Sequence, residues 1–149
     1  VLYEDENPYN VIEPGKRPRA TLTPALAIKD KRPFLSFAVQ GGDTQDQNLL
    51  QFFLNMVEFE MNVQEAAEAA NVNSYQMYSS FGSHSKEAGR IVVRDDTPPW
   101  VIKDLRSKGY NVVTRRLTSG PINAIWFDHK NGTMWGGSSN FGEDYGIGW

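Results

Sequence analysis

The stretch of sequence between residues 21 and 47 constrains the fold most strongly, because two predicted strands, a glycine pair and a predicted helix follow one another there. The strands are expected over Thr21–Lys29 and Phe34–Val39, and they are joined by a short charged turn. Strands joined in this way pair residues whose numbers sum to about 62, which would place Thr21 beside Gly41. The chain must then pass from a hairpin into a helix directly after Gly41.

The junction at Gly41 and Gly42 has the features of an anion site. Consecutive glycines can orient successive backbone N–H groups toward one point, and the helix that follows adds the positive end of its dipole. The hydroxyl of Thr21 would be a further donor there. A second interpretation is that the two glycines only turn a strand into a helix.

Length and composition favour one compact module. A chain of 149 residues buries roughly 70% of its unfolded surface on folding. Hydrophobic residues make up 40% and aromatic residues 12%, as in globular proteins, and the net charge of −3 gives no general attraction to nucleic acid or to an anionic membrane. Three cations near the start are interpreted as a solvated or ion-paired loop, not a nucleic-acid patch: Lys16, Arg17 and Arg19.

No cofactor or metal site is predicted. The chain has no cysteine, which excludes disulfides, thiol catalysis and cysteine-ligated metals. His84 and His129 have no Asp, Glu or His partner at ligand spacing, so both are expected at the surface. No apolar stretch approaches the ~20 residues of a membrane span. Neither the composition nor the chain start fixes a cellular compartment.

The first half of the chain is expected to hold two helices after the hairpin. Residues Val1–Pro18 carry several prolines among charges and are expected to be extended over a surface. Asp43 and Asp46 resemble a capping box for the first helix. The predicted buried face of that helix consists of Leu50, Phe53, Leu54 and Val57. The second helix follows Asn62, with Glu65 in the capping position and small residues for close packing at Ala66, Ala67, Ala69 and Ala70.

The second half alternates strands with a helix. Residues Asn71–Gly89 lack periodicity and are expected to cross the surface as a loop. Further on, the pattern predicts a strand at Arg90–Arg94 and a second strand at Tyr110–Thr114. The helix between them is expected to be capped by Thr97, to have Pro98 at its first position and to end at Gly109. A hairpin of Asn123–Phe127 with Thr133–Gly137 is expected to turn at Asn131-Gly132. This order of elements favours an α+β fold.

At these residues the chain resembles the gamma-glutamyltransferases (gamma-glutamyltranspeptidases) and their cephalosporin-acylase-like relatives. The resemblance covers nearly the whole chain, and it is carried by five stretches: PGKRP…LTP at Pro14–Pro24, Gly41-Gly42, the helix through Asn55, NVQEA at Asn62–Ala66, and RIVV…LRSKGY…V at Arg90–Val113. It implies an α+β module of an N-terminal-nucleophile hydrolase, a four-layer αββα sandwich. It also implies self-cleavage that frees an N-terminal threonine, which attacks gamma-glutamyl amides such as glutathione.

The threonine that this family uses as nucleophile is missing from the sequence. The chain begins Val1-Leu2-Tyr3, and nothing in it resembles the Thr-Thr-His/Ser start of the mature small subunit. Residues 1–149 are therefore expected to be a single module, the C-terminal portion of the small (beta) subunit, either as a fragment or as one piece of a multi-chain enzyme. The implied partners are the large subunit, the threonine-bearing part of the small subunit, and a small-molecule or peptide acyl amide.

The resemblance assigns roles to individual residues. Gly41 and Gly42 correspond to the glycines whose N–H groups form the family's oxyanion hole. Gln40 stands where the family usually has proline, which leaves the donors less rigidly placed. Ala20 and Thr21 align with two serines that bind the substrate alpha-carboxylate, and only Thr21 keeps a hydroxyl. The lost donor weakens the case for a glutamyl group and strengthens that for another acyl group.

Three alternatives stay open from the sequence. Thr21 can be an ordinary strand residue, and Asp43 and Asp46 can contact substrate instead of capping a helix. The third alternative is that the chain is a binding or interaction module without catalysis and not part of an enzyme.

The end of the chain departs from the family pattern. The family usually closes with Gly-Ala-Ser-Asp-Pro-Arg, whereas this chain reads GGSSNF at Gly136–Phe141. The apolar Phe141, Tyr145 and Trp149 are expected to fill contacts there instead. Members of the family are often periplasmic or extracellular.

Overall fold

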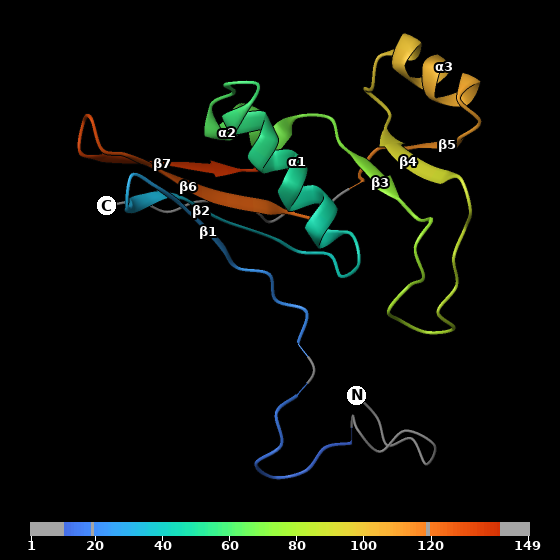
Figure 1. Ribbon diagram of the computed structural model, residues 1–149, viewed down its shortest axis with the longest axis horizontal. Helices are drawn as coiled ribbons and strands as arrows, with labels where there is room; N and C mark the ends of the chain where they lie inside the picture. The colour runs from blue at the N-terminus through green and yellow to red at the C-terminus, as the bar shows by residue number, and fades with distance from the viewer. Residues whose placement is uncertain (1–10, 19, 119, 141–149) are drawn as a thin grey trace.

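The computed structural model describes residues 11–18, 20–118 and 120–140. In chain order its elements are β1 (Ala25–Lys29), β2 (Arg32–Val39), α1 (Gln45–Val57), α2 (Val63–Glu68), β3 (Val72–Ser74), β4 (Arg90–Arg94), α3 (Pro99–Ser107), β5 (Asn111–Arg115), β6 (Ile122–Asp128) and β7 (Thr133–Ser138). They form two sheets, and helices and strands are mixed as the α+β expectation requires (Figure 1).

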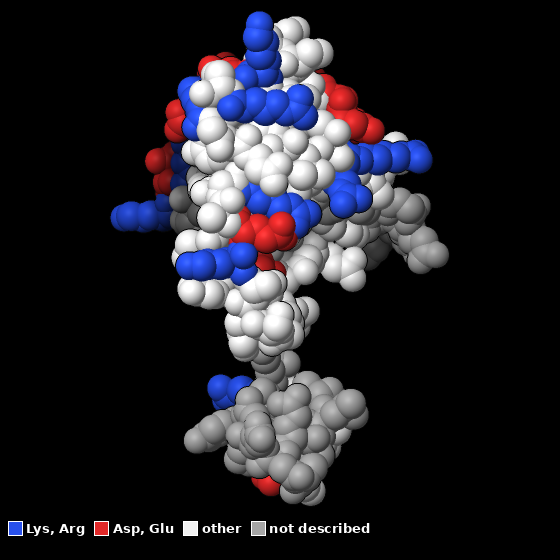
Figure 2. Space-filling model, turned by 90° about the vertical axis from the view of Figure 1, so that its right-hand side faces the viewer, with Lys and Arg blue, Asp and Glu red and all other residues white. Residues whose placement is uncertain are grey.

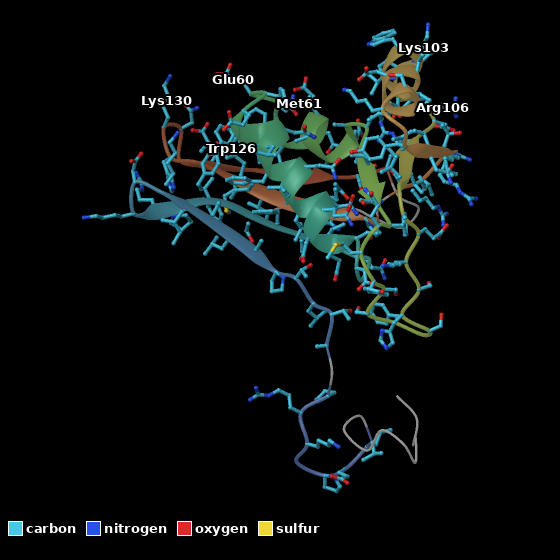
Figure 3. The ribbon with its side chains drawn as sticks, turned by 45° about the vertical axis from the view of Figure 1, so that its right-hand side comes forward. Glu60, Met61, Lys103, Arg106, Trp126 and Lys130 are labelled. Carbon is cyan, nitrogen blue, oxygen red and sulfur yellow. The ribbon has the colours of Figure 1, made fainter. Side chains whose placement is uncertain are left out.

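The larger sheet has four antiparallel strands in the order β1-β2-β6-β7, and α1 and α2 lie on one of its faces (Figure 1). The core lies between this face and the helices, with Leu35 and Phe52 almost fully buried. Trp126 lies on the same side of the sheet as the helices, whereas Lys130 lies at the tip of the β6–β7 hairpin (Figure 3). Burial of apolar side chains on this face holds the layer together.

The β1–β2 hairpin has the predicted register but a shorter first strand. Ala25 pairs with Phe37 and Ala27 with Leu35, so the numbers sum as expected, and a bulge follows Ala27. The prediction that the strand begins at Thr21 is wrong. Pro24 has no N–H to donate and lies just before the ladder, so β1 begins at Ala25. Thr21 is thus not the ladder partner of Gly41.

The smaller sheet has the order β3-β4-β5, with β3 antiparallel and β5 parallel to β4. The strand–helix–strand order was predicted, and α3 packs Ile102 and Leu105 on the buried Ile91, Val93 and Val112. The predicted start of α3 was one residue early: Pro98 occupies the N-cap position and no side chain caps the helix. Gly109 ends the helix with a φ of +89°, as expected for a C-terminal glycine.

The predicted cap of α1 is wrong, and its predicted buried face is confirmed only for Phe53, which packs partly buried against the core. Thr44 is the N-cap residue and no side chain caps the helix, so the proposed Asp43–Asp46 box does not form. The helix buries Leu49 and Phe52, together with the polar Gln45 and Asn48, and it leaves Leu50 59% exposed. The face is rotated because Gln45 and Asn48 find hydrogen-bond partners inside the molecule.

Helix α2 begins as predicted. The side chain of Asn62 accepts hydrogen bonds from the N–H groups of Gln64 and Glu65, and the carboxylate of Glu65 accepts from the Asn62 N–H. Ala66 and Ala67 are buried against the sheet. The helix ends at Glu68, so the predicted packing role of the two later alanines, Ala69 and Ala70, falls outside it.

Two connections differ from the sequence expectation. Residues 71–89 are not wholly irregular, because Val72–Ser74 forms β3 at the edge of the smaller sheet. The β6–β7 hairpin closes through four residues, 129–132, because Asp128 still pairs with Thr133. His129 is exposed as predicted, yet its Nε2 lies 2.6 Å from the Pro33 carbonyl oxygen.

The chain before β1 is extended and leads away from the larger sheet (Figure 1). Lys16 lies 4.0 Å from the Glu13 carboxylate, in agreement with an ion-paired loop. The expectations for residues 1–10, Arg19, Phe141, Tyr145 and Trp149 lie outside the described residues. Among the described helices, none combines the length and the apolar character that crossing a membrane requires.

Candidate functional site

A cavity of about 810 Å³ opens at the N-terminal end of α1. Ala20, Thr21 and Gly42 all contribute to its lining. These three residues come from the extended segment before β1 and from the β2–α1 junction, so the fold brings together predicted site residues from two places in the sequence. Gly41 and Gln40 precede Gly42 in the chain and are not among the lining residues in the described part of the structure.

The glycine pair has the backbone geometry of a tight junction. Gly42 has a φ of +106°, a conformation that favours glycine, and its carbonyl accepts a hydrogen bond from the Gln45 N–H at 3.0 Å. Within the described residues, the N–H groups of Gly41 and Gly42 donate to no protein acceptor. Gly42 lines the cavity and Gly41 precedes it, so the pair brings two backbone donors without a described protein acceptor to this edge of the cavity.

The residues around the pair are fixed in place. The side chain of the buried Gln45 donates to the Val39 carbonyl at 3.0 Å and so ties the start of α1 to the end of β2. The Gln40 N–H donates to the Pro121 carbonyl at 3.1 Å. Gly120 approaches the Gln40 carbonyl so closely that no side chain fits at residue 120. Gln40 therefore has backbone restraints of its own, although it lacks the ring of a proline.

Asp43 makes contacts that no pattern in the sequence indicates. Its Oδ2 accepts from the Ser79 hydroxyl at 3.0 Å and from the Ser80 N–H at 2.8 Å, and its Oδ1 accepts from the Ser80 hydroxyl. We call these contacts the Asp43 clasp. The partners are 36 and 37 positions away in the sequence, so no local pattern signals them. The clasp ties the residue after the glycine pair to the segment Tyr75–Phe81.

The segment Tyr75–Phe81 forms the opposite wall of the cavity, together with part of residues 85–90. Phe81 lies against Gly42: a Cβ atom added to Gly42 would be 3.1 Å from the ring Cε2. The segment is held from behind as well, because Gln47 and Gln51 of α1 each exchange two hydrogen bonds with the backbone of β3. Helix α1 thus positions both sides of the cavity.

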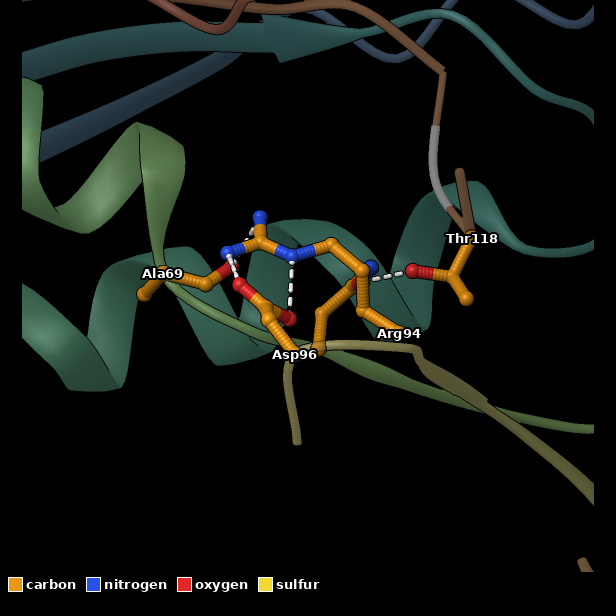
Figure 4. A network of polar contacts seen from close by, with 5 residues as sticks. Ala69, Arg94, Asp96 and Thr118 are labelled. Atoms are coloured by element: carbon orange, nitrogen blue, oxygen red, sulfur yellow. Dashed lines mark hydrogen bonds and ion pairs between the residues drawn. The ribbon is translucent and has the colours of Figure 1, made fainter. Parts of the chain in front are cut away.

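A second cavity of about 650 Å³ lies between α1, α2 and residues 116–118, and none of the predicted site residues lines it. A polar network borders it (Figure 4). Arg94 pairs with both carboxylate oxygens of Asp96, at 2.7 and 2.5 Å, and donates to the Ala69 carbonyl; Thr118 donates to Asn71. The hydrogen bond from Arg94 lowers the pKa of Asp96, and the same bond raises the pKa of Arg94. Through Arg94 and Ala69, this network joins β4 of the smaller sheet to the end of α2.

Two further observations concern the charges and the possible metal ligands of the described residues. Over the face seen in Figure 2, Lys and Arg side chains are interspersed with Asp and Glu and do not form one basic patch. In the described part of the chain, no group of three or more His, Cys, Asp and Glu side chains is arranged to hold a metal ion. The arrangement fits a ligand held by backbone N–H and hydroxyl donors.

Comparisons with known proteins give the relationships of this chain. The family described as gamma-glutamyltranspeptidase matches residues 1–149. A glutathione hydrolase proenzyme from Bacillus subtilis strain 168 is 31% identical over 140 residues, which is 93% of this chain and 22% of that protein. The chain thus spans about a fifth of the length of this curated relative.

Solved structures share the fold. A cephalosporin acylase from Bacillus halodurans superposes with a TM-score of 0.69 at 26% identity, over 91% of this chain and 24% of the other. A gamma-glutamyltranspeptidase from Pseudomonas nitroreducens has a TM-score of 0.70 at 22% identity, over 100% of this chain and 71% of the other. Such neighbours confirm the expected α+β fold. With a family match over its whole length, this chain belongs to the gamma-glutamyltranspeptidase family.

Proposed function

We propose that this chain is the C-terminal portion of the small subunit of an acyl-transferring enzyme. The complete enzyme cleaves gamma-glutamyl or related acyl amides, such as glutathione, and passes the acyl group to water or to an amine. Family membership over residues 1–149 supports the reaction class. The observation that carries the proposal is the pair of unengaged N–H groups at Gly41 and Gly42, next to a cavity that also holds Thr21.

In this proposal the glycine pair stabilises the tetrahedral intermediate. A threonine outside this sequence attacks the amide carbonyl, and the negative charge that develops on the carbonyl oxygen is met by the N–H groups of Gly41 and Gly42. The amine leaves, and water or a second amine then takes the acyl group from the threonine. Each such backbone donor contributes about 3–4 kcal/mol to transition-state stabilisation.

The acyl group is bound on the Thr21 side of the cavity. The Thr21 hydroxyl can donate to a polar atom of the acyl group, while Ala20 offers only a methyl group. Gln40 contributes through its fixed backbone. A site with one hydroxyl fewer than the usual serine pair binds an alpha-carboxylate less tightly, because one charge-assisted hydrogen bond is absent. This favours a cephalosporin-acylase-like choice of acyl group over strict glutamyl specificity.

The remainder of the enzyme is the partner. Among the described residues, helices lie on only one face of the larger sheet, and its other face carries the exposed side chains of Leu26, Ile125 and Met134. An apolar sheet face of this kind needs a covering layer. We assign that role to the second sheet of the αββα sandwich, contributed by the large subunit and the threonine-bearing part of the small subunit.

The test is turnover by the complete enzyme that contains this chain. Gamma-glutamyl-4-nitroanilide should release 4-nitroaniline, and an added amine such as glycylglycine should accelerate the release if the acyl group is transferred. A variant that replaces the N-terminal threonine with alanine is the control and should be inactive. A complete, processed enzyme that releases no 4-nitroaniline from this or any other acyl anilide would contradict the proposal.

Ala20 and Gln40 also favour a second candidate, a binding or interaction module without catalysis, because both depart from the family pattern at the proposed site. Such a module would bind an acyl amide without cleaving it. Calorimetry with the uncleaved anilide therefore separates the two candidates: binding together with turnover identifies the enzyme, and binding alone identifies the module.

A further inference from the structure

We infer that the segment Tyr75–Phe81 is a specificity wall that selects an acyl group with an uncharged, apolar body, such as an aryl-alkyl chain. This inference rests on the proposed function, because it describes the acyl side of the same cavity. It adds the class of acyl group and the residues that select it, Met77 and Tyr78.

The first observation is the apolar surface inside the cavity. Met77 is 81% exposed and Tyr78 is 67% exposed, and both line the cavity together with Leu22 and Phe81, which are exposed as well. Exposed apolar side chains that gather around one hollow mark a binding groove more often than an ordinary surface. The hollow is continuous with Gly42 and Thr21, so the apolar lining starts beside the proposed oxyanion position.

The second observation is that the wall is a built feature. The Asp43 clasp holds Ser79 and Ser80, Phe81 lies against Gly42, and Gln47 of α1 holds the backbone of Ser74 just before the wall. A wall attached to the glycine pair at this many points keeps a fixed distance from the reacting carbonyl. Fixed walls discriminate between substrates by shape and polarity.

The third observation is the charge of the lining. Arg90 is ion-paired with Glu87, and Lys86 Nζ lies over the Tyr78 ring at 4.6 Å from its centroid, while Asp43 and Asp46 line the same cavity. The described lining therefore offers no excess of positive charge to an acyl group that carries a carboxylate. An acyl group with an uncharged body needs no positive charge in the lining, and its burial against Met77 and Tyr78 stabilises the bound state.

The experiment compares two amides with one leaving group in the complete enzyme that contains this chain. The probes are the 4-nitroanilides of 4-phenylbutyric acid and of glutaric acid. In both, water replaces 4-nitroaniline on the acyl carbon, so one absorbance signal reports both reactions. The unsubstituted enzyme should have the higher kcat/KM on the phenylbutyryl anilide, by about tenfold or more, since even small apolar contacts discriminate by 10–200-fold.

The variant carries Met77→Ser and Tyr78→Ser together. Both side chains are largely exposed, so the change leaves the core intact. The ratio of the two kcat/KM values should fall about tenfold, and Tyr78→Phe should keep it. Trp100→Ser, which alters an exposed aromatic on α3 outside the cavity, should change neither value. A ratio that is unchanged in the double variant would overturn the inference while the proposed function stands.

If the unsubstituted enzyme cleaves neither anilide, the proposed function fails for these acyl groups, and binding decides the inference. Calorimetry with 4-phenylbutyrate and with glutarate then measures the same preference without catalysis. Tighter binding of 4-phenylbutyrate that the double serine variant loses would support the wall. Equal binding of the two acids, or a preference that survives in the variant, would overturn it.

Discussion

At the scale of single residues, Gly42 is restricted for two independent reasons. Its φ of +106° strains any L side chain, and an added Cβ would lie 3.1 Å from the ring of Phe81. Gly41 is restricted by space alone: its φ is not in the positive range, but an added Cβ would lie 2.9 Å from Thr44 Oγ1, and a β-branched side chain is stiff. Gly42 is therefore the glycine that both the backbone turn and the specificity wall restrict.

Gly42→Ala in the complete enzyme should lower kcat by about 100-fold, because the strained backbone would misdirect a donor of the proposed oxyanion hole. The KM should change less, since the donor acts mainly in the transition state. Gly132→Ala is the matched control: Gly132 also has a positive φ, +67°, but nothing lies within 4 Å of an added Cβ and it lies in the β6–β7 loop. Equal losses of kcat in the two variants would show that strain alone is responsible.

Gly137→Ala tests the packing of α2 on the larger sheet. An added Cβ would be 2.7 Å from the Val63 carbonyl oxygen and 2.9 Å from its carbonyl carbon, and a backbone obstacle cannot move aside without shifting the start of α2. We expect a loss of about 1–3 kcal/mol in the free energy of unfolding. Gly136→Ala is the neighbouring control with nothing within 4 Å. Urea unfolding of the complete enzyme measures both, and equal midpoints would contradict the packing argument.

At the scale of elements, side chains that bind backbone hold the two halves of the cavity together. Gln47 and Gln51, one turn apart on α1, present their amides to the backbone of Ser74 and Val72 in β3. Each amide both donates and accepts, so it acts as a substitute strand partner. The Asp43 clasp repeats the arrangement with a carboxylate. Helix α1 and the residue Asp43 just before it therefore hold both walls of the cavity in position.

Asp43→Ala should loosen the segment Tyr75–Phe81 without unfolding α1, because Asp43 does not cap that helix. The Ser80 N–H loses its acceptor, so its hydrogen exchange should accelerate. Asp46→Ala is the control, since Asp46 is an exposed acid in the first turn of the same helix and makes no hydrogen bond to another described residue. Exchange followed by mass spectrometry over residues 75–81 measures the effect. Equal exchange in both variants would mean that the clasp does not hold the wall.

The β6–β7 hairpin should respond to acid through Asp128. Its carboxylate accepts from the Asn131 side chain at 2.6 Å and from the N–H groups of Lys130 and Asn131, and these bonds lower the pKa of Asp128. A lowered pKa stabilises the folded state above the ordinary carboxyl range of about 4, and this contribution is lost as the pH falls through the folded value.

Asp128→Ala should therefore be less stable than the unsubstituted protein at pH 7, and the difference should shrink below about pH 4. Thermal unfolding midpoints of the complete enzyme between pH 3 and pH 7 measure it. Asn131→Ala removes the largest cause of the pKa shift and should show a part of the same pH dependence. A difference that stays constant across this range would mean that the loss comes from hairpin geometry and not from the charge.

The sequence predicted the elements whose signals are local. The capping box of Asn62 and Glu65, the strand at Arg90–Arg94 and the glycine end of α3 all lie within a few residues of the structure they specify. The buried face of α1 was predicted only in part, because the buried Asn48 is bonded to Asn71, 23 residues away. Strand β3 was missed for the same reason, since it is three residues long and depends on glutamines of α1.

The candidate site likewise combines residues with a local sequence signal and residues whose contacts are distant in the sequence. The glycine pair and Thr21 were proposed as site residues from the sequence, because consecutive glycines after a strand have special backbone properties and match a family pattern. The opposite wall was not found. Residues 75–81 have no periodicity, and their contacts with Asp43 and Gly42 arise only when two distant segments meet at the end of α1.

At the scale of the whole molecule, the described helices cover only one face of the larger sheet. Across the other face, Leu26, Ser36, Ile125 and Gly136 form a row of paired residues. Leu26 is 58% exposed and Ile125 44% exposed. In this row the apolar Leu26 and Ile125 alternate with the small Ser36 and Gly136. Sheet faces that pack on each other lie about 10 Å apart.

Ile125→Lys should prevent assembly of the complete enzyme. A lysine at the centre of the row would bring an unpaired charge between two sheets, and burying such a charge costs several kcal/mol or keeps the sheets apart. The side chain points away from the helices, so the fold of this module should survive. Co-purification of the remaining chains with a tagged copy of this chain measures assembly, and circular dichroism reports on the fold. Trp100→Lys places the same charge at an exposed apolar site on α3 and should leave assembly intact. Full assembly of the Ile125→Lys protein would mean that the rest of the enzyme does not bind to the open face of the larger sheet. The smaller sheet and α3 would then be the next surface to test by substitution.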